Sequence, residues 1–154
     1  MDTEQTLNSL LVKFFRRITM IEEEQLVTEE FNDITYNDMH VIEAVGLKEP
    51  QKMSQIAKEM RVTTGTLTKA VNSLEKKGYV IRQRIERDKR VVNIILTERG
   101  IDAYNHHERF HQEMIAFVLD HISESESEVL RKALEKLMDY FKQKYSCASR
   151  QTGK

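Results

Sequence analysis

Hydrophobic side chains recur every three or four residues along most of this chain, the spacing that places them on one face of a helix. Leu7, Leu10, Phe14, Ile18 and Ile21 follow that spacing and predict one long helix over residues 3–29. The same spacing predicts further helices between Thr35 and Gly46, over 53–60, 64–77 and 98–120, and from Ser123 to Tyr145. The pattern therefore indicates a mostly α-helical protein.

The pattern changes between residues 80 and 96, where hydrophobic and polar side chains alternate. Alternation predicts strands over residues 80–85 and 92–96, joined by a polar turn at 86–89. Along the chain, a short helix, a tight turn at 61–63, a capped helix that ends at Gly78 and a basic hairpin follow one another. That order is typical of a winged helix-turn-helix with a two-stranded wing.

The length and composition limit the possible domain number, disulfides and membrane segments. A chain of 154 residues fits one domain, or a small domain with helical extensions. The single cysteine, Cys147, cannot form an intrachain disulfide, which suits a reducing compartment. No stretch resembles a signal peptide or is apolar for long enough to cross a bilayer, so we expect a cytoplasmic protein with no membrane partner.

Charge is unevenly distributed along the chain, although the net charge is only −1. Residues 1–34 carry 3 basic and 8 acidic side chains, whereas residues 53–92 carry 10 basic and 4 acidic ones. A basic segment within a neutral chain indicates a local site for a polyanion. Together with the predicted helix-turn-helix, it indicates double-stranded DNA as the partner.

The helix over residues 64–77 presents a polar face that can enter the major groove. Its hydroxyls can bond phosphates or base edges, and Gly65 allows a phosphate to approach the backbone closely. Lys69 can reach phosphate or guanine, and Asn72 suits adenine. The contacts expected from the helix-turn-helix are Ser54, Thr63, Thr64, Gly65, Thr66, Thr68, Lys69 and Asn72.

The hairpin supplies the second set of expected contacts, namely Arg82, Arg84, Arg87, Asp88, Lys89 and Arg90. An arginine-rich strand pair can follow the DNA backbone and insert a guanidinium into the minor groove, a role we expect for Arg90. Asp88 stands out among these cations, and we expect it to hold a neighbouring arginine in one geometry. The alternative is that the hairpin is only a charged edge that prevents aggregation.

No arrangement typical of catalysis is present. The sequence has no glycine-rich phosphate loop, no His-Glu-x-x-His motif and no nucleophile beside a base. We therefore expect no catalytic residues, no cofactor and no enzyme. A repressor that responds to an effector is favoured over a purely architectural DNA-binding protein, and the effector site is unknown.

The hairpin region resembles the MarR family of bacterial transcription regulators. The resemblance lies in residues 71–80, Arg82, Asp88-Lys89-Arg90 and Leu96-Thr97-Glu98-Arg99-Gly100. It implies an obligate homodimer, in which residues 1–34 and 98–154 form a helical dimerisation region and residues 35–97 form the DNA-binding domain. Apolar stripes at both chain ends fit this arrangement, because a second copy can cover them. Each subunit would then meet one half-site of a pseudo-palindromic operator.

Shorter motifs resemble the MarR-type repressor of fatty-acid synthesis genes in Gram-positive bacteria. They are Phe31-Asn32-Asp33-Ile34-Thr35, Met39-His40, Gly46, Thr64-Gly65-Thr66 and Arg109-Phe110-His111. This resemblance implies a repressor of lipid synthesis with long-chain acyl-acyl carrier protein as its corepressor.

A zinc-responsive regulator is the alternative. A zinc-sensing branch of the same family builds its sites from a glutamate, a histidine and a His-x-x-x-His pair. Here Glu24, His40, His107 and His111 have that pattern, and their side chains suit zinc. The other interpretation, which we favour, is that these histidines are hydrogen-bonded interior or interface residues with no bound metal.

Overall fold

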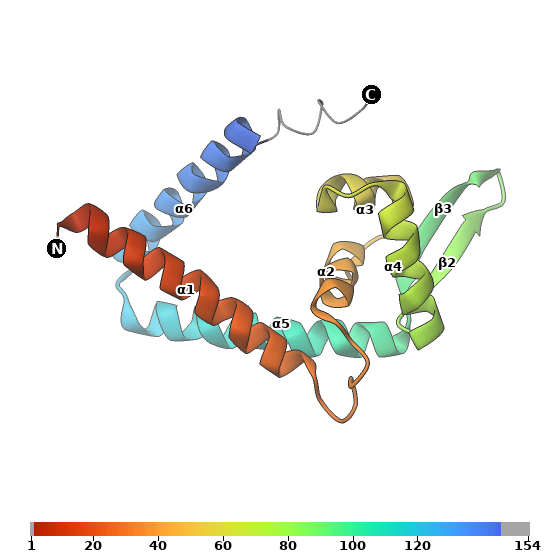
Figure 1. The fold of residues 1–154 in the computed structure, drawn as a ribbon, viewed down its shortest axis with the longest axis horizontal. Helices are drawn as coiled ribbons and strands as arrows, with labels where there is room; N and C mark the ends of the chain where they lie inside the picture. The colour runs from red at the N-terminus through yellow and green to blue at the C-terminus, as the bar shows by residue number, and fades with distance from the viewer. Residues whose placement is uncertain (1, 146–154) are drawn as a thin grey trace. The chain divides into compact units, whose positions relative to one another are not determined.

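The computed structural model describes residues 2–145, which form six helices and three strands (Figure 1). The elements are α1 (Thr3–Leu26), α2 (Tyr36–Val45), β1 (Gln51–Lys52), α3 (Met53–Met60), α4 (Thr64–Lys77), β2 (Val80–Ile85), β3 (Asp88–Leu96), α5 (Glu98–His121) and α6 (Glu124–Tyr145). The mostly helical fold with a hairpin between α4 and α5 confirms the prediction. The chain forms two compact units, one ending at Phe110 and one beginning at His111.

Side-chain caps set where the helices begin. Thr35 Oγ1 accepts a hydrogen bond from the backbone N–H of Asp38 (3.1 Å), and the Asp38 carboxylate accepts one from the N–H of Thr35 (3.0 Å). This reciprocal cap confirms the predicted beginning of α2. Helix α1 ends at Leu26 rather than at residue 29, because the Thr28 hydroxyl accepts the N–H of Phe31 (3.0 Å) and closes a turn there.

The sheet has three strands in the order β1-β3-β2, all antiparallel, where the sequence predicted two. The additional strand is the two-residue β1, in which Gln51 pairs with Ile94 and Lys52 with Asn93. Such a short strand has no alternating pattern of its own, so the sequence shows only a loop there. The return strand also begins earlier than predicted, at Asp88 rather than Val92.

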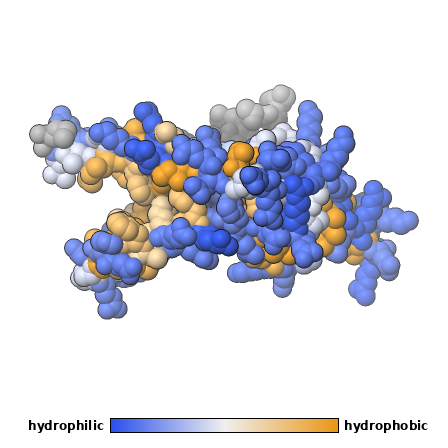
Figure 2. Space-filling model, turned by 90° about the horizontal axis from the view of Figure 1, so that it is seen from below, coloured by the Kyte–Doolittle hydropathy of each residue, from blue (hydrophilic) through white to orange (hydrophobic). Residues whose placement is uncertain are grey.

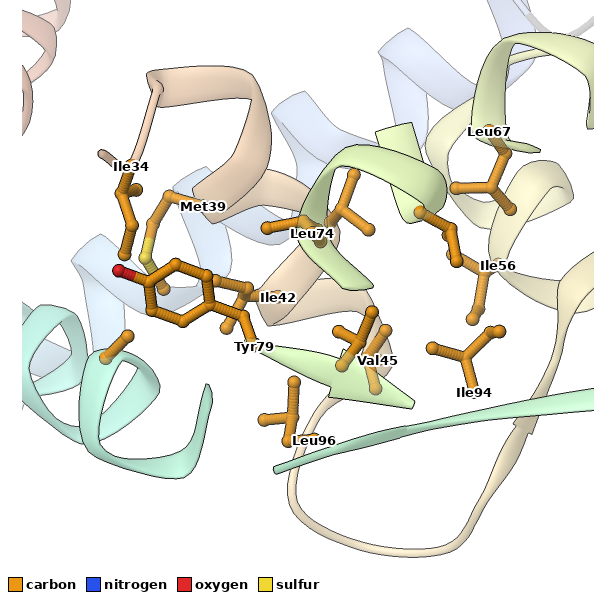
Figure 3. Close-up of a cluster of buried hydrophobic side chains, with 14 of the residues drawn as sticks. Ile34, Met39, Ile42, Val45, Ile56, Leu67, Leu74, Tyr79, Ile94 and Leu96 are labelled. Carbon is orange, nitrogen blue, oxygen red and sulfur yellow. The ribbon is translucent and has the colours of Figure 1, made fainter. Parts of the chain in front are cut away.

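One hydrophobic core joins α2, α3, α4 and the sheet (Figure 3). Leu67, Val71 and Leu74 are buried on one face of α4, as the helical spacing predicted. They lie in the same cluster as Ile56 of α3 and Ile94 of β3. The opposite face of α4 is thereby left to solvent, so the core fixes which side chains α4 can offer to a partner.

Tyr79 anchors the base of the hairpin. Its side chain is fully buried, its hydroxyl donates to Asp33 Oδ1 (2.6 Å), and the guanidinium of Arg99 lies 4.4 Å from the ring centroid. Burial, followed by the hydrogen bond to Asp33, raises the pKa of the Tyr79 phenol. Arg99 also donates to the backbone carbonyl of Lys77 (2.7 Å). These contacts connect the segment before α2, the end of α4 and the beginning of α5.

Several helices carry hydrophobic side chains on exposed faces. On α1, Leu10 is 59% exposed, and on α6, Leu134 is 49% exposed. None of the described residues of α6 is buried. An amphipathic helix gains most of its stability from burying its apolar face, so these faces need a covering surface. Within residues 2–145, no helix is long and apolar enough to cross a membrane.

Candidate nucleic-acid interface

The interface begins at the first turn of α4. Thr63 caps the helix, since its Oγ1 accepts the backbone N–H of Thr66 (3.1 Å) and its hydroxyl donates to Thr66 Oγ1 (2.9 Å). The sequence left Thr63 and Thr64 open as the cap, and the structure selects Thr63. The Thr68 hydroxyl donates to the carbonyl of Thr64 (2.7 Å). Three of the predicted hydroxyl contacts therefore stabilise the helix itself.

The predicted contacts lie on α3, on α4 with its N-cap and on the adjacent hairpin (Figure 1). Each of them is exposed except Arg82, which is partly buried. The face seen in Figure 2 is mostly hydrophilic around the winged part, on the right of the view. A surface of this kind can approach a hydrated polyanion without burying apolar groups.

A hollow of about 520 Å³ lies between the helix-turn-helix and the hairpin. Predicted contacts from four elements line it, namely Ser54, Thr64, Thr68, Arg82 and Arg90. Lys52 of β1 lines the hollow as well, and it was not predicted because the sequence gives no signal for β1. Residues of the helix-turn-helix and of the wing therefore line the same hollow.

A bulge near the wing tip positions Arg90. Arg84 pairs with Val92, but the next residue, Ile85, pairs with Asp88, so residues 89–91 of β3 have no counterpart on β2. Bulges of this kind turn side chains out of the regular alternation. The Asp88 carboxylate accepts the backbone N–H of Arg90 (3.0 Å). The expectation was that Asp88 holds a neighbouring arginine, but the contact found is with the backbone of Arg90 and not with its guanidinium.

Arg82 belongs to a separate cluster with α4. Its Nη2 donates to Asn72 Oδ1 (2.5 Å), and its Nη1 lies 3.2 Å from Glu75 Oε1. Asn72 and Arg82 were predicted at the interface from the sequence, but Glu75 was not. The sequence could have indicated Glu75, because it lies three residues after Asn72 and residues with that spacing are neighbours on the surface of a helix.

The candidate zinc residues Glu24, His40 and His107 belong to α1, α2 and α5, and none of them is on α4 or the hairpin. His107 is buried, with its Nε2 at 2.7 Å from Glu43 and 3.8 Å from Glu22. His40 is exposed, and its Nδ1 lies 3.4 Å from Glu43. Glu24 is exposed, so Glu22 is the α1 carboxylate that faces His107.

Burial of the His107 imidazole opposes its protonation. The hydrogen bond that the imidazole donates to Glu43, followed by the charges of Glu43, Glu22 and Glu108, outweighs burial and raises the pKa of His107. His111 follows one helical turn later on α5, in the second unit. Cys147 lies outside the described residues.

A short helix, a tight turn, a polar recognition helix and a basic hairpin, packed on one core, define a winged helix-turn-helix protein. The chain belongs to the MarR family, whose characteristic sequence matches residues 34–92. The HTH-type transcriptional regulator PchR of Bacillus subtilis is 30% identical over 137 residues, which cover 87% of this chain and 78% of PchR.

Two further similarities extend this result. The crystal structure of Streptococcus pneumoniae FabT in complex with DNA has a TM-score of 0.84 and 38% identity, and covers 91% of this chain and 98% of FabT. The HTH-type transcriptional regulator SarZ of Staphylococcus haemolyticus is 39% identical over 71 residues, 46% of this chain and 48% of SarZ. The match thus spans about half of that regulator's length. Because the relatives are transcriptional regulators, they confirm the prediction that this chain is not an enzyme.

Proposed function

We propose that this protein is a transcriptional regulator that binds double-stranded DNA with α4 in the major groove and the hairpin along the backbone. The observation that carries the proposal is the joint surface of α4 and the wing, where exposed hydroxyls and cations line one hollow. Helix α4 positions the contacts to bases, and the bulge at residues 89–91 directs Arg90 toward a groove. Because bacterial genes are regulated in the cytoplasm, we propose that the protein acts there.

The second element of the proposal is a homodimer. The exposed apolar faces of α1 and α6 support it, because each needs a covering surface. Residues 1–34 and 98–154 would form the dimerisation region, and residues 35–97 the DNA-binding domain. A two-fold dimer presents two copies of α4, so its operator would be pseudo-palindromic.

The third element is the signal. The motifs at residues 31–35 and 109–111 resemble the fatty-acid-synthesis repressors, and the 38% identity with FabT supports the same subgroup. We therefore propose repression of fatty-acid synthesis genes, with long-chain acyl-acyl carrier protein as corepressor.

Electrophoretic mobility shift tests the first proposal, with promoter fragments bound by the protein in its source organism as probes. Lys69→Ala and Arg90→Ala are expected to weaken the shift at least about tenfold, since contacts to phosphates and bases are lost. Lys136→Ala, on the exposed surface of α6, is the matched control and keeps wild-type affinity. Unchanged binding in both test variants contradicts the proposed surface.

The same mobility-shift assay tests the proposed corepressor. Acyl-acyl carrier protein is expected to strengthen the shift, whereas the unacylated carrier leaves it unchanged. An equal response to both forms contradicts the corepressor proposal without affecting DNA binding.

Zinc response remains the second candidate, and the closeness of Glu22, Glu43 and His107 favours it. Two carboxylates and an imidazole suit tetrahedral zinc, which would be held there with its charge balanced. Metal analysis of the purified protein after zinc addition and dialysis tests this candidate. His107→Gln is expected to lose the metal, and His121→Gln, at the end of α5, to retain it. Absence of tightly bound zinc from the wild type contradicts this candidate.

A further inference from the structure

We propose that the hollow between the helix-turn-helix and the hairpin receives a phosphate of the DNA backbone, and that Lys52 of β1 contacts this phosphate. The proposal rests on the proposed function, because the phosphate belongs to the DNA that α4 and the hairpin would bind. It assigns a DNA contact to a strand that lies outside both the helix-turn-helix and the hairpin.

The side chains that line this hollow suit an anion. They include three cations and three hydroxyls, which belong to Lys52, Arg82 and Arg90 and to Ser54, Thr64 and Thr68. The other lining residues are apolar, so among residues 2–145 no carboxylate lines the hollow. Cations and hydroxyls without a carboxylate are the groups that bind phosphate oxygens where proteins contact DNA.

Two of the three cations are available to a phosphate. The Arg82 guanidinium lies 3.2 Å from a carboxylate oxygen of Glu75, which offsets its charge. Lys52 and Arg90 are both exposed, and neither forms an ion pair within the described part of the chain. A phosphate in the hollow would therefore meet two cations whose charge is not already balanced.

Two of the three hydroxyls can donate to a phosphate. A threonine hydroxyl has one hydrogen, and that of Thr68 is directed to the carbonyl of Thr64 (2.7 Å). The hydroxyls of Ser54 and Thr64 have no hydrogen-bond partner among the residues that the structure describes. The hollow thus offers two charged donors and two neutral donors, which come from both strands and both helices that line it.

The backbone positions of the two available cations are fixed. Lys52 pairs with Asn93 of β3, and its N–H donates to the side chain of Gln55 in the first turn of α3 (3.3 Å). The N–H of Arg90 donates to the Asp88 carboxylate (3.0 Å). Side chains that start from fixed positions lose less freedom on binding, so both are suited to hold one phosphate.

Lys48 provides a comparison four residues earlier in the chain. It is exposed as well, but it lines a different hollow, together with Glu49 and the apolar side chains of Ile95 and Ile101. A carboxylate and apolar side chains do not suit a phosphate. The two lysines therefore carry the same charge in different surroundings, and Lys48→Ala is the matched control for Lys52→Ala.

The first test measures the affinity of the full chain for a bound promoter fragment at several salt concentrations, with circular dichroism to establish that each variant is folded. Lys52→Ala is expected to weaken binding on the order of tenfold at about 0.1 M salt, and to make the plot of log affinity against log salt concentration less steep by about 1. Non-specific duplexes should be affected alike, because a phosphate carries no sequence information. Lys52→Arg keeps the charge and should retain the wild-type slope, and Lys48→Ala should retain both slope and affinity.

The second test distinguishes a phosphate of DNA from a free phosphate ion. Duplexes carry a single uncharged methylphosphonate, placed at each backbone position in turn. At one position per half-site it is expected to weaken binding of the wild type on the order of tenfold and to leave Lys52→Ala unaffected, since that variant has already lost the contact. If the hollow instead holds a free ion, no position would depend on Lys52. Inorganic phosphate at constant ionic strength would then alter DNA binding by the wild type but not by Lys52→Ala.

Three results would overturn this inference alone. They are wild-type affinity and slope in Lys52→Ala, equal losses in Lys52→Ala and Lys48→Ala, and the absence of any methylphosphonate position that depends on Lys52. Each would leave DNA binding through Lys69 and Arg90 intact. A wild type that binds no DNA, or unchanged binding in both Lys69→Ala and Arg90→Ala, would contradict the proposed function itself.

Discussion

Gly100, in the first turn of α5, lies directly against the backbone carbonyl of Tyr79, at the start of the hairpin. A β-carbon at residue 100 would overlap the Tyr79 oxygen and approach Leu96 Cβ to 3.2 Å. Tyr79 cannot move aside easily, because its hydroxyl is bonded to Asp33 and its ring lies against Arg99. The smallest residue is therefore required where α5 meets the wing.

Gly100→Ala is expected to lower the free energy of unfolding by about 3 kcal/mol, the upper part of the range for an overpacked core. Gly65→Ala is the matched control, since the atom nearest to its added carbon is Thr63 Oγ1 at 3.9 Å. The control should raise stability by up to about 1 kcal/mol, because alanine favours helix. Urea unfolding followed by circular dichroism measures both, and equal stability of the two variants would contradict the expected overlap.

Tyr79→Phe should lower the free energy of unfolding by about 1 kcal/mol at neutral pH, through loss of the hydrogen bond to Asp33. Burial, followed by that hydrogen bond, raises the pKa of Tyr79, so the fold favours the protonated phenol. This contribution is complete below about pH 10, the ordinary pKa of tyrosine, and is lost as the pH rises further. The difference between wild type and variant should therefore shrink in alkaline solution, and a constant difference would count against it.

Asp38→Ala should be strongly destabilising, by about 3 kcal/mol. The buried carboxylate accepts both the N–H of Thr35 (3.0 Å) and the ammonium of Lys77 (2.7 Å). Glu135→Ala removes an exposed partner of Arg131 and should change stability by less than about 1 kcal/mol. Chemical unfolding compares the two, and similar losses would show that burial of the first pair has no consequence.

If the proposed dimer forms through α6, Leu134→Glu should convert it to a monomer, because the change places a charge within the exposed apolar face of α6. Leu47→Glu makes the same change at an exposed leucine in the loop after α2, and should leave the dimer intact. Analytical ultracentrifugation distinguishes the outcomes. A Leu134→Glu protein that stays dimeric would place the subunit contact elsewhere.

Arg87→Ala should make the plot of log affinity for DNA against log salt concentration less steep by about 1, since one phosphate contact is lost. The Arg87 side chain is exposed at the wing tip. Asn72→Ala should weaken binding to the operator and leave the salt slope unchanged, because asparagine carries no charge. Identical slopes for the wild type and Arg87→Ala would remove Arg87 from the backbone contacts.

The elements that carry a strong periodic pattern were predictable from the sequence. Helix α4 is an example: Leu67, Val71 and Leu74 mark its buried face, and Thr63 and Gly78 mark its limits. The two residues of β1 were not predictable, because their pairing with Asn93 and Ile94 is a tertiary contact with no local signal.

The candidate site was predictable as a set of exposed residues but not as a set of contacts. Thr63, Lys69 and Arg90 are exposed where the sequence placed them. The engagement of Asn72 by Arg82 depends on how β2 passes α4, and spacing along the chain does not contain that geometry. For the same reason, Glu22 rather than Glu24 faces His107.

The hairpin has more strand neighbours at its base than at its tip, and this difference affects how it can bend. Strand β3 has neighbours on both sides only at Asn93 and Ile94, whereas toward the tip its sole neighbour is β2 and the bulge interrupts even that pairing. The base of the hairpin is therefore held by the core, whereas its tip is held by no other element of residues 2–145. A load on Arg87 would bend the hairpin near its tip, where the bulge interrupts the pairing, and leave the core undisturbed. The flexibility expected of the hairpin is thus confined to the residues between the bulge and the tip.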